Sequence, residues 1–413
     1  MNNILNIAII GGGAAGFFAA ITAKKTYPKA NITIFERGNK VLAKVEVTGG
    51  GRCNLTNTFA NITDLKQAYP RGSKLMKRLF KSFDNEACMQ WFRSHGVPLI
   101  IQEDQCVFPK AQDSHAVINA LTKEAKRLGI NIIVCKQLIA LEQPMEGYFR
   151  LTFKDGTDRL FHRVAITTGG APLQKQLAYL QTLNHKVEAP VPSLFTFNID
   201  DKKILKLMGT VIDPVVATML GTKLRTVGPL LITHWGMSGP AILKLSSHAA
   251  RILGENDYKG QVAINWVGER TRTEVETTIN RIISENPKKQ LGNVRPFNLT
   301  TKLWLYLIDK VELEETKPWG ELGKKGFNRM VEVLVNDVYG ISGKGSYKEE
   351  FVTCGGISLK SIDQNTLESK TCSGLFFAGE ILDVDGITGG FNLQAAWTMG
   401  YTVGLWIGKT KEE

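Results

Sequence analysis

The sequence has no C-x-x-C pair among its six cysteines and no cysteine or histidine spacing typical of a metal site. This absence argues against a zinc centre and against a dithiol redox couple. Repeats and low-complexity tracts are missing as well. We therefore expect no metal, and we expect reduced thiols in a cytoplasmic protein. The cysteines are Cys53, Cys88, Cys106, Cys135, Cys354 and Cys372.

The first 23 residues contain no charged side chain, a pattern shared with signal peptides and membrane spans. We expect neither, because no basic segment precedes the apolar run and clustered glycines suit a phosphate-binding turn better than a membrane helix. The chain is otherwise of ordinary composition, with 43% hydrophobic residues in 413, which predicts two or three domains. The net charge of +12 is able to attract phosphorylated cofactors, acidic substrates or nucleic acid, and by itself selects none of them.

A glycine turn near the start organises the rest of the chain. The apolar run 7–10 is followed by Gly11, Gly13 and Gly16 in the spacing G-x-G-x-x-G, and then by a helix-like stretch from Phe17. This order predicts strand, phosphate-binding turn and helix, with the helix N-terminus facing a pyrophosphate. A second β-rich run ends at Glu36, an acid placed to accept hydrogen bonds from the hydroxyls of an adenosine ribose. We interpret these features as a dinucleotide site; the alternative is a glycine-rich structural turn.

A second glycine cluster lies at 44–57, where Gly49, Gly50 and Gly51 precede Arg52, Cys53 and Asn54. The stretch is too rich in glycine and short polar residues to predict a regular element, and we expect a loop against which a ligand lies. The alternative is a flexible linker.

The end of the chain repeats the opening pattern. An apolar run at 374–378 leads to Gly379 and Glu380, and a glycine turn at 389–390 precedes a helix expected over 392–406. An earlier buried strand, 164–168, also ends in glycines. A surface loop before an ordinary terminal helix is the alternative interpretation of the C-terminal pattern.

These motifs together resemble the two-dinucleotide-binding-domain flavoproteins, in particular the BaiN-like bacterial family that includes the bile-acid 3-dehydro-Δ4,6-reductase type. The family's Gly-Gly-Gly-Arg-Cys-Asn signature matches at 49–54, with Thr48 where family members usually have serine. The resemblance implies FAD, with adenosine on Glu36 and a ribityl hydroxyl on Glu380. It implies cofactor contacts at Gly11, Gly13, Ala14, Ala15, Gly16, Glu36, Arg37, Lys44, Thr48, Gly49, Gly50, Gly51, Arg52, Cys53, Asn54, Thr168, Gly169, Gly379, Glu380, Asp383, Gly390, Asn392, Leu393, Gln394 and Ala395.

The expected fold is α/β, with a discontinuous Rossmann-like FAD-binding domain of the glutathione-reductase type over 1–190 and 350–413. From about residue 191 the β-α alternation stops, and short β-like runs predict an inserted β-barrel-like domain over 191–268 and 339–349. Helical apolar spacing predicts a small helical subdomain over 269–338. We expect the insertions to cap the flavin ring.

The resemblance implies reduction of an activated carbon–carbon double bond in a small enone-like substrate. No second full G-x-G-x-x-G is present, so NAD(P)H is expected as a transient electron donor rather than a resident of its own Rossmann domain. No catalytic residue is assigned. His234 is a candidate proton donor, although a structural hydrogen-bonding role is favoured, and Cys53 has no resolving partner and is expected to pack rather than to carry electrons.

Two alternatives are ranked behind the reductase. A flavoprotein acting on RNA would explain the positive charge and the basic cluster of Lys324, Lys325 and Arg329. A non-enzymatic flavin redox sensor would bind FAD without turning over a donor and acceptor pair.

Overall fold

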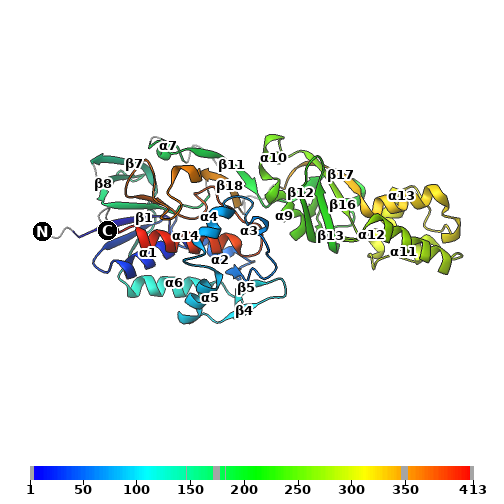
Figure 1. Ribbon diagram of the computed structural model, residues 1–413, viewed down its shortest axis with the longest axis horizontal. Coiled ribbons are helices and arrows are strands. Elements are labelled where there is room, and N and C mark those ends of the chain that lie inside the picture. The colour runs from blue at the N-terminus through cyan, green and yellow to red at the C-terminus, as the bar shows by residue number, and fades with distance from the viewer. Residues whose placement is uncertain (1–3, 146, 171–176, 182, 346–351, 410–413) are drawn as a thin grey trace. The chain divides into compact units, whose positions relative to one another are not determined.

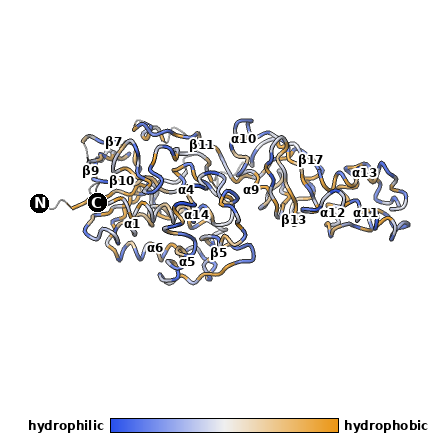
Figure 2. Tube along the Cα trace, in the orientation of Figure 1, coloured by the Kyte–Doolittle hydropathy of each residue, from blue (hydrophilic) through white to orange (hydrophobic). Residues whose placement is uncertain are grey.

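The computed structural model describes residues 4–145, 147–170, 177–181, 183–345 and 352–409, and divides the chain into two compact units (Figure 1). Unit 1 comprises residues 1–191 and 352–413, and unit 2 comprises residues 192–351. Hydrophobic segments occur within both units (Figure 2). Each unit has its own cluster of buried apolar side chains.

A five-stranded parallel sheet forms the centre of unit 1, in the order β19-β10-β1-β2-β6. The strands are β1 Asn6–Ile10, β2 Asn31–Phe35, β6 Asn131–Ile133, β10 Arg163–Ile166 and β19 Leu375–Phe377. Strand β1 lies in the middle and is almost wholly buried, which explains its unbroken apolar run, because parallel strands are covered on both faces. Helix α1 (Ala14–Thr26) connects β1 to β2, so the arrangement is the Rossmann type.

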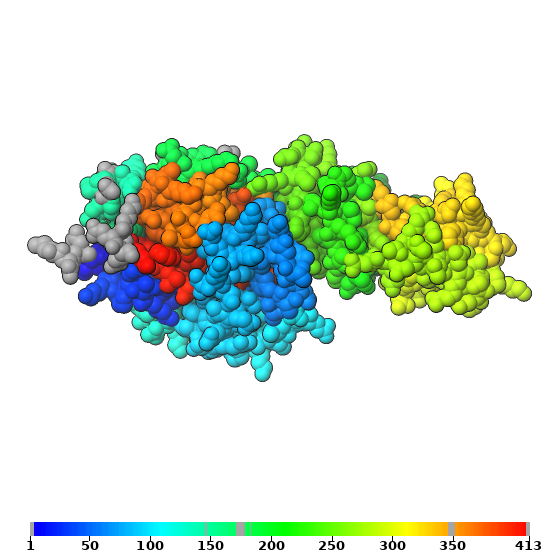
Figure 3. All heavy atoms as spheres, in the orientation of Figure 1, coloured from blue at the N-terminus to red at the C-terminus, as the bar shows by residue number. Residues whose placement is uncertain are grey.

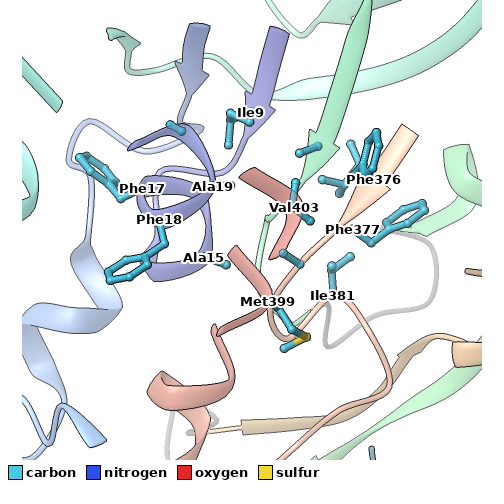
Figure 4. Packing of buried hydrophobic residues seen from close by; sticks show 14 of the residues in the cluster. Ile9, Ala15, Phe17, Phe18, Ala19, Phe376, Phe377, Ile381, Met399 and Val403 are labelled. Atoms are coloured by element: carbon cyan, nitrogen blue, oxygen red, sulfur yellow. The ribbon is translucent and has the colours of Figure 1, made fainter. Parts of the chain in front are cut away.

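Helices α1 and α14 (Phe391–Trp406) pack closely against each other beside this sheet. A Cβ added at Gly400 would lie 2.4 Å from the carbonyl oxygen of Ala15, and one at Gly404 would lie 2.4 Å from the Cβ of Thr22. Figure 4 shows Ala15 and Ala19 of α1 lying across from Met399 and Val403 of α14. The first and last helices of the chain are therefore held together by backbone contact that only glycine permits.

The remaining elements of unit 1 surround the sheet. Its helices are α2 Ala43–Val47, α3 Leu65–Ala68, α4 Ser73–Leu79, α5 Asn85–Ser94, α6 His115–Arg127 and α7 Ala178–Gln181, with a 3-10 turn at Leu359–Ser361. Its other strands are β3 Thr56–Asn57, β4 Leu99–Ile101, β5 Cys106–Pro109, β7 Leu138–Met145, β8 Tyr148–Phe153, β9 Asp158–Phe161, β11 Val187–Ser193 and β18 Val352–Ile357.

The prediction that 44–57 has no regular structure was wrong at both ends. Residues 44–47 belong to the one-turn helix α2, which buries Val45, and Thr56 and Asn57 form β3, which pairs antiparallel with β5. Packing and strand pairing stabilise these short elements despite their unfavourable local composition. Only the glycine-rich centre of the segment is irregular.

Unit 2 is built on a closed six-stranded barrel in the order β12-β15-β14-β13-β16-β17. The strands are β12 Phe197–Ile199, β13 Val211–Met219, β14 Arg225–Ile232, β15 Gly236–Ser238, β16 Gly260–Asn265 and β17 Asp337–Lys344. The helices are α8 Lys202–Leu205, α9 Pro240–His248, α10 Ala250–Glu255, α11 Arg272–Glu285, α12 Thr301–Lys310 and α13 Gly323–Val335, with 3-10 turns at Leu291–Asn293 and Trp319–Glu321.

The barrel and the helices between β16 and β17 share one hydrophobic cluster, in which Trp266 of the barrel side accompanies Trp304 and Trp319 of the helical side. Unit 2 is therefore a single compact body. That its barrel and helical parts are separate domains stays a prediction. The chain enters the unit from β11 and leaves it into β18, and these two strands pair with each other.

Candidate functional site

The three glycines of the opening motif have different surroundings. A Cβ at Gly11, whose φ is +116°, would lie 2.4 Å from the carbonyl oxygen of Thr167, and one at Gly16 would lie 2.0 Å from that of Gly11. A Cβ at Gly13 would meet nothing within 4 Å. Gly11 and Gly16 are thus required by the fold, whereas Gly13 borders open space, as a backbone that a phosphate approaches should.

The N-terminus of α1 lies beside that space. Its N-cap is Gly13, no side chain caps it, and its first turn contains no acidic residue. The backbone N–H groups and the helix dipole are therefore not neutralised by the helix itself. Ala14 is half-buried and Ala15 is buried, so the two alanines contribute backbone rather than functional side chains.

Glu36 lies at the end of β2 with both carboxylate oxygens held by backbone. Oε2 accepts a hydrogen bond from the N–H of Gly12 and Oε1 accepts one from the N–H of Gly38, each at 2.8 Å. A carboxylate oxygen accepts more than one bond, so the half-buried group remains able to accept hydroxyls. The neighbouring Arg37 is exposed.

The early glycine cluster turns through three successive left-handed residues. Gly49, Gly50 and Gly51 have φ of +60°, +69° and +84°. Arg52 folds back over this turn: its Nε donates to the carbonyl of Gly49 at 3.0 Å and its guanidinium lies 4.5 Å from the ring centre of Phe108. The Arg52 guanidinium, an implied cofactor contact, is thus partly used to hold the loop itself.

Cys53 is completely buried, and this burial raises its thiol pKa to about 12. The hydroxyl of Thr48, which also donates to the carbonyl of Val45 at 2.8 Å, lowers the thiol pKa, but its effect is smaller than that of burial. Because a thiol with such a pKa is protonated at neutral pH, its environment favours packing over electron transfer.

The early loop and the C-terminal glycine turn contact each other directly. A Cβ at Gly390 would lie 2.4 Å from the carbonyl oxygen of Thr56. Oriented to satisfy both ends, the Asn54 amide accepts from the N–H of Gly390 at 3.3 Å and donates to the carbonyl of Thr56 at 3.1 Å. The Asn57 amide also donates to the carbonyl of Gly389 at 3.1 Å. In the space-filling view the C-terminal residues (red) lie between the N-terminal (blue) and the preceding (orange) segments of unit 1 (Figure 3).

Glu380 connects several predicted residues. Its carboxylate accepts from the Lys44 ammonium at 3.0 Å and from the backbone N–H of Thr353 at 2.8 Å. A Cβ at Gly170 would lie 2.6 Å from Oε1, and one at Gly169 would lie 3.9 Å from Oε2. The strand end at 167–170 and the acid after β19 are therefore neighbours.

Other predicted residues nearby differ in exposure. A Cβ at Gly379 would lie 3.1 Å from that of Ala15. Thr168 is exposed, while Asp383 is half-buried and its N–H donates to the carbonyl of Ile357 at 3.0 Å.

The start of α14 resembles that of α1 in its electrostatics. The N-cap Gly390 has φ of +87°, no side chain caps the helix, and its first turn contains no acid. The Asn392 amide exchanges two hydrogen bonds of 2.8 Å with the backbone of Gly386, and the buried Gln394 accepts from the hydroxyl of Thr56 at 2.6 Å. These two side chains hold the turn, so a ligand would meet the helix backbone. Leu393 is half-buried and Ala395 is buried.

Sequence reasoning missed an ion pair next to this turn. The Arg71 guanidinium binds the carboxylate of Asp385 through two donors, with Nε to Oδ1 at 2.6 Å. The Asp385 side chain is 1% exposed and that of Arg71 is 12% exposed. The hydroxyl of Tyr69 donates to the carbonyl of Phe391 at 2.9 Å. Because these partners lie more than 300 residues apart, no local pattern could have indicated them.

His234 belongs to unit 2, between β14 and β15, where it is exposed and its ring centre lies 3.5 Å from that of Trp235. Its role as a proton donor stays a prediction. Among the residues that the structure describes, no cluster of side chains suits a metal ion, and no helix is long and apolar enough to cross a membrane.

The chain is similar in sequence or fold to several known proteins. The chain is 27% identical to the 3-dehydro-bile acid delta(4,6)-reductase of Clostridium scindens, over 96% of this chain and 98% of that protein. It is 26% identical to the ribosomal RNA dihydrouridine synthase of Haemophilus influenzae, over 97% and 98%. Among solved structures, 3-ketosteroid-Δ4-(5α)-dehydrogenase from Rhodococcus jostii matches with a TM-score of 0.47 at 13% identity, over 98% and 97%.

The family model for the HI0933-like protein Rossmann domain matches residues 5–406, which include both units. The chain therefore belongs to the HI0933-like Rossmann family and is an oxidoreductase of the flavoprotein type.

Proposed function

We propose that this protein is an FAD-dependent reductase of a carbon–carbon double bond conjugated to a carbonyl group, in a small enone-like substrate, with NAD(P)H as the transient electron donor. The relative from Clostridium scindens is named for a reductase of this kind, and it aligns over nearly the whole of both chains. When bound, FAD supplies a hydride from flavin N5, and the protein supplies orientation and electrostatics.

The residues present fit this cofactor. The open space over Gly13 accommodates a pyrophosphate next to the uncapped start of α1. Glu36 accepts from the adenosine ribose and disfavours a 2′-phosphate there. Glu380 is placed to accept from a ribityl hydroxyl, and the uncapped start of α14 stabilises negative charge on the flavin pyrimidine ring.

One observation carries the proposal: the glycine turns at 49–51 and 389–390, far apart in sequence, are in contact. The Gly390 backbone approaches Thr56 so closely that a Cβ would lie 2.4 Å from the Thr56 carbonyl oxygen, and Asn54 bonds to the same glycine. Together with the α1 and α14 contact, this brings three glycine-rich segments into one unit. Contacts within the protein require glycine at Gly11, Gly16 and Gly390, whereas a shared dinucleotide would explain Gly13 and Gly50, at which an added Cβ would meet nothing within 4 Å.

A second candidate substrate is uridine in RNA. The 26% identical relative from Haemophilus influenzae is named for the synthesis of dihydrouridine in ribosomal RNA, and the net charge of +12 suits a polyanion. Dihydrouridine forms by reduction of a ring double bond conjugated to a carbonyl, so the two candidates share one chemistry and differ in the size and charge of the substrate.

The experiment is to purify the protein, record its visible spectrum, and follow anaerobic bleaching by NADH and by NADPH. Reoxidation is then measured after adding conjugated ketones or unmodified ribosomal RNA. We expect a yellow protein that a nicotinamide bleaches and a conjugated ketone reoxidises. RNA as the only effective oxidant would select the second candidate, bleaching without any reoxidation would favour a redox sensor, and a protein that stays colourless with added FAD would refute the proposal.

Glu36→Arg tests the adenosine assignment in the same preparation. The arginine removes the acceptor for the ribose hydroxyls, so FAD occupancy, measured as the ratio of visible to ultraviolet absorbance, should fall. Glu36→Gln, which keeps one acceptor oxygen and the side-chain shape, should lie between the variant and the unmodified protein. Equal occupancy in all three would contradict the assignment.

A further inference from the structure

Unit 2 contains a polar concavity that the reductase chemistry does not use. It has a volume of about 760 Å³ and lies between the end of α11 and the start of α12, in the yellow-green region of Figure 1. Lys289 and Arg295 supply its positive charge, and Asn286, Asn293, Asn298 and Thr301 supply hydrogen-bonding groups. No acidic residue is among the described residues that line it.

The two cations are not neutralised by neighbours. Across the described ranges, neither Lys289 nor Arg295 forms an ion pair, whereas Arg329 on α13 pairs with Glu312 at 3.1 Å. Nη1 of Arg295 donates to the Thr301 hydroxyl at 2.7 Å and to the Leu299 carbonyl at 3.3 Å. These bonds hold the guanidinium of the exposed Arg295 beside the start of α12, and among the described residues Nε and Nη2 form no hydrogen bond.

Backbone N–H groups at the start of α12 add to the positive potential of the concavity. Phe297 and Asn298 have φ of +56° and +57°, and the turn that they form leads into α12 at the N-cap Thr300. The Thr300 hydroxyl satisfies only the N–H of Leu303. The earlier N–H groups of the first turn and the dipole of this ten-residue helix therefore favour an anion at the same end.

We propose that this concavity, which we call the 286–301 pocket, binds the sugar–phosphate backbone of an RNA strand. Two cations in a lining that contains no acidic residue match phosphates, and the amides match ribose hydroxyls and base edges. The volume is larger than one phosphate needs, and the charge of the whole chain favours a polyanion. The inference rests on the second candidate function, reduction of a base in RNA, for which it supplies a docking site.

The test measures binding of a fluorescein-labelled single-stranded RNA to the whole protein by fluorescence anisotropy, without a nicotinamide, over a range of KCl concentrations. Each phosphate contact contributes about 0.7 to the salt slope for single strands, so Lys289→Ala should weaken binding about 5-fold near 0.1 M salt. The double variant with Arg295→Ala should weaken it about 25-fold and lower the slope by about 1.4.

A matched control removes the same charge from another face of the same unit. Lys206→Ala with Lys223→Ala changes two exposed lysines, one after α8 and one between β13 and β14, that do not line the pocket, and RNA affinity should fall less than 3-fold. Equal losses in both double variants would show general attraction and overturn the pocket assignment. The Lys289→Ala variant is a control for misfolding, because the Lys289 side chain forms no hydrogen bond or ion pair among the described residues.

Two further outcomes would also overturn the proposal. One is RNA affinity unchanged in the pocket variants. The other is binding of inorganic pyrophosphate by the pocket without any binding of RNA, which would assign it to a small phosphorylated ligand. Because no step of this test requires hydride transfer, failure of the pocket leaves the reductase assignment standing, and failure of the reductase assay does not affect the binding result.

Discussion

Replacement of Gly13 by alanine should separate cofactor binding from folding. The added Cβ would meet no protein atom within 4 Å, and the residue has φ of −95°, which alanine adopts without strain. At an N-cap, alanine is less favourable than glycine by up to about 1 kcal/mol. The reduced flexibility of the unfolded chain offsets about 0.4 to 1 kcal/mol of this cost. The free energy of unfolding of the apo protein should therefore change by less than about 1 kcal/mol.

Affinity for FAD should respond differently, because the methyl group occupies the space assigned to the pyrophosphate. Forcing a methyl group into a close-packed contact costs about 1 to 3 kcal/mol, which corresponds to about 5- to 150-fold weaker binding. The measurements are thermal unfolding of the apo protein and titration with FAD followed by flavin fluorescence.

Gly16→Ala is the matched comparison, since its Cβ would lie 2.0 Å from the carbonyl oxygen of Gly11. That variant should lose stability as well as FAD. If Gly13→Ala binds FAD as tightly as the unmodified protein, the pyrophosphate does not pass over Gly13 and our reasoning about the site is wrong.

Three further predictions concern the framework of the site. Gly400→Ala should destabilise the protein by about 1 to 3 kcal/mol in denaturant unfolding, because its Cβ would overlap α1. Gly340→Ala is the control and should not destabilise the protein, because its Cβ would meet nothing within 4 Å. Equal losses of stability in the two variants would contradict the helix contact. Arg71→Met should cost about 3 to 5 kcal/mol of unfolding free energy, because it removes the guanidinium that pairs with the buried Asp385 carboxylate, and a loss below 1 kcal/mol would refute this role for the pair. Burial raises the pKa of Cys53 from 9 in the unfolded chain to about 12, so its protonated thiol stabilises the fold fully below pH 9, and this stabilisation is lost as the pH rises from 9 to 12. Cys53→Ala should therefore flatten the curve of unfolding free energy against pH over that range. An unchanged curve would argue against the raised pKa.

The sequence predicted those site residues that are fixed by backbone conformation and by their spacing from the nearest strand or helix. The glycines at 11 and 16, the acid at 36 and the uncapped helix after Gly390 are predictable because each follows a strand or begins a helix. The Rossmann fold, the closed barrel and the family are confirmed by the structure and the comparisons.

What the sequence could not predict depends on pairing between distant segments. Helix α2 and strand β3 exist because Val45 packs inward and Thr56 pairs with Val107, and neither event has a local signature. The ion pair of Arg71 and Asp385 also has no local sequence pattern that would indicate it. The hydrogen bonds that the Asn392 and Gln394 side chains form within the protein are likewise absent from any local pattern. The FAD contacts of the individual residues stay predictions.

The pairing of β11 with β18 has an evolutionary consequence. Because the chain leaves unit 1 after β11 and returns at β18, and these two strands pair, the 160 residues of unit 2 are inserted into the Rossmann-type unit at a single point. Substitutions in unit 2 therefore need not disturb the glycine turns of unit 1. Substitutions can thus accumulate in the inserted unit of one lineage and not of another, and the two relatives named for a bile acid and for ribosomal RNA both align with this chain across that unit.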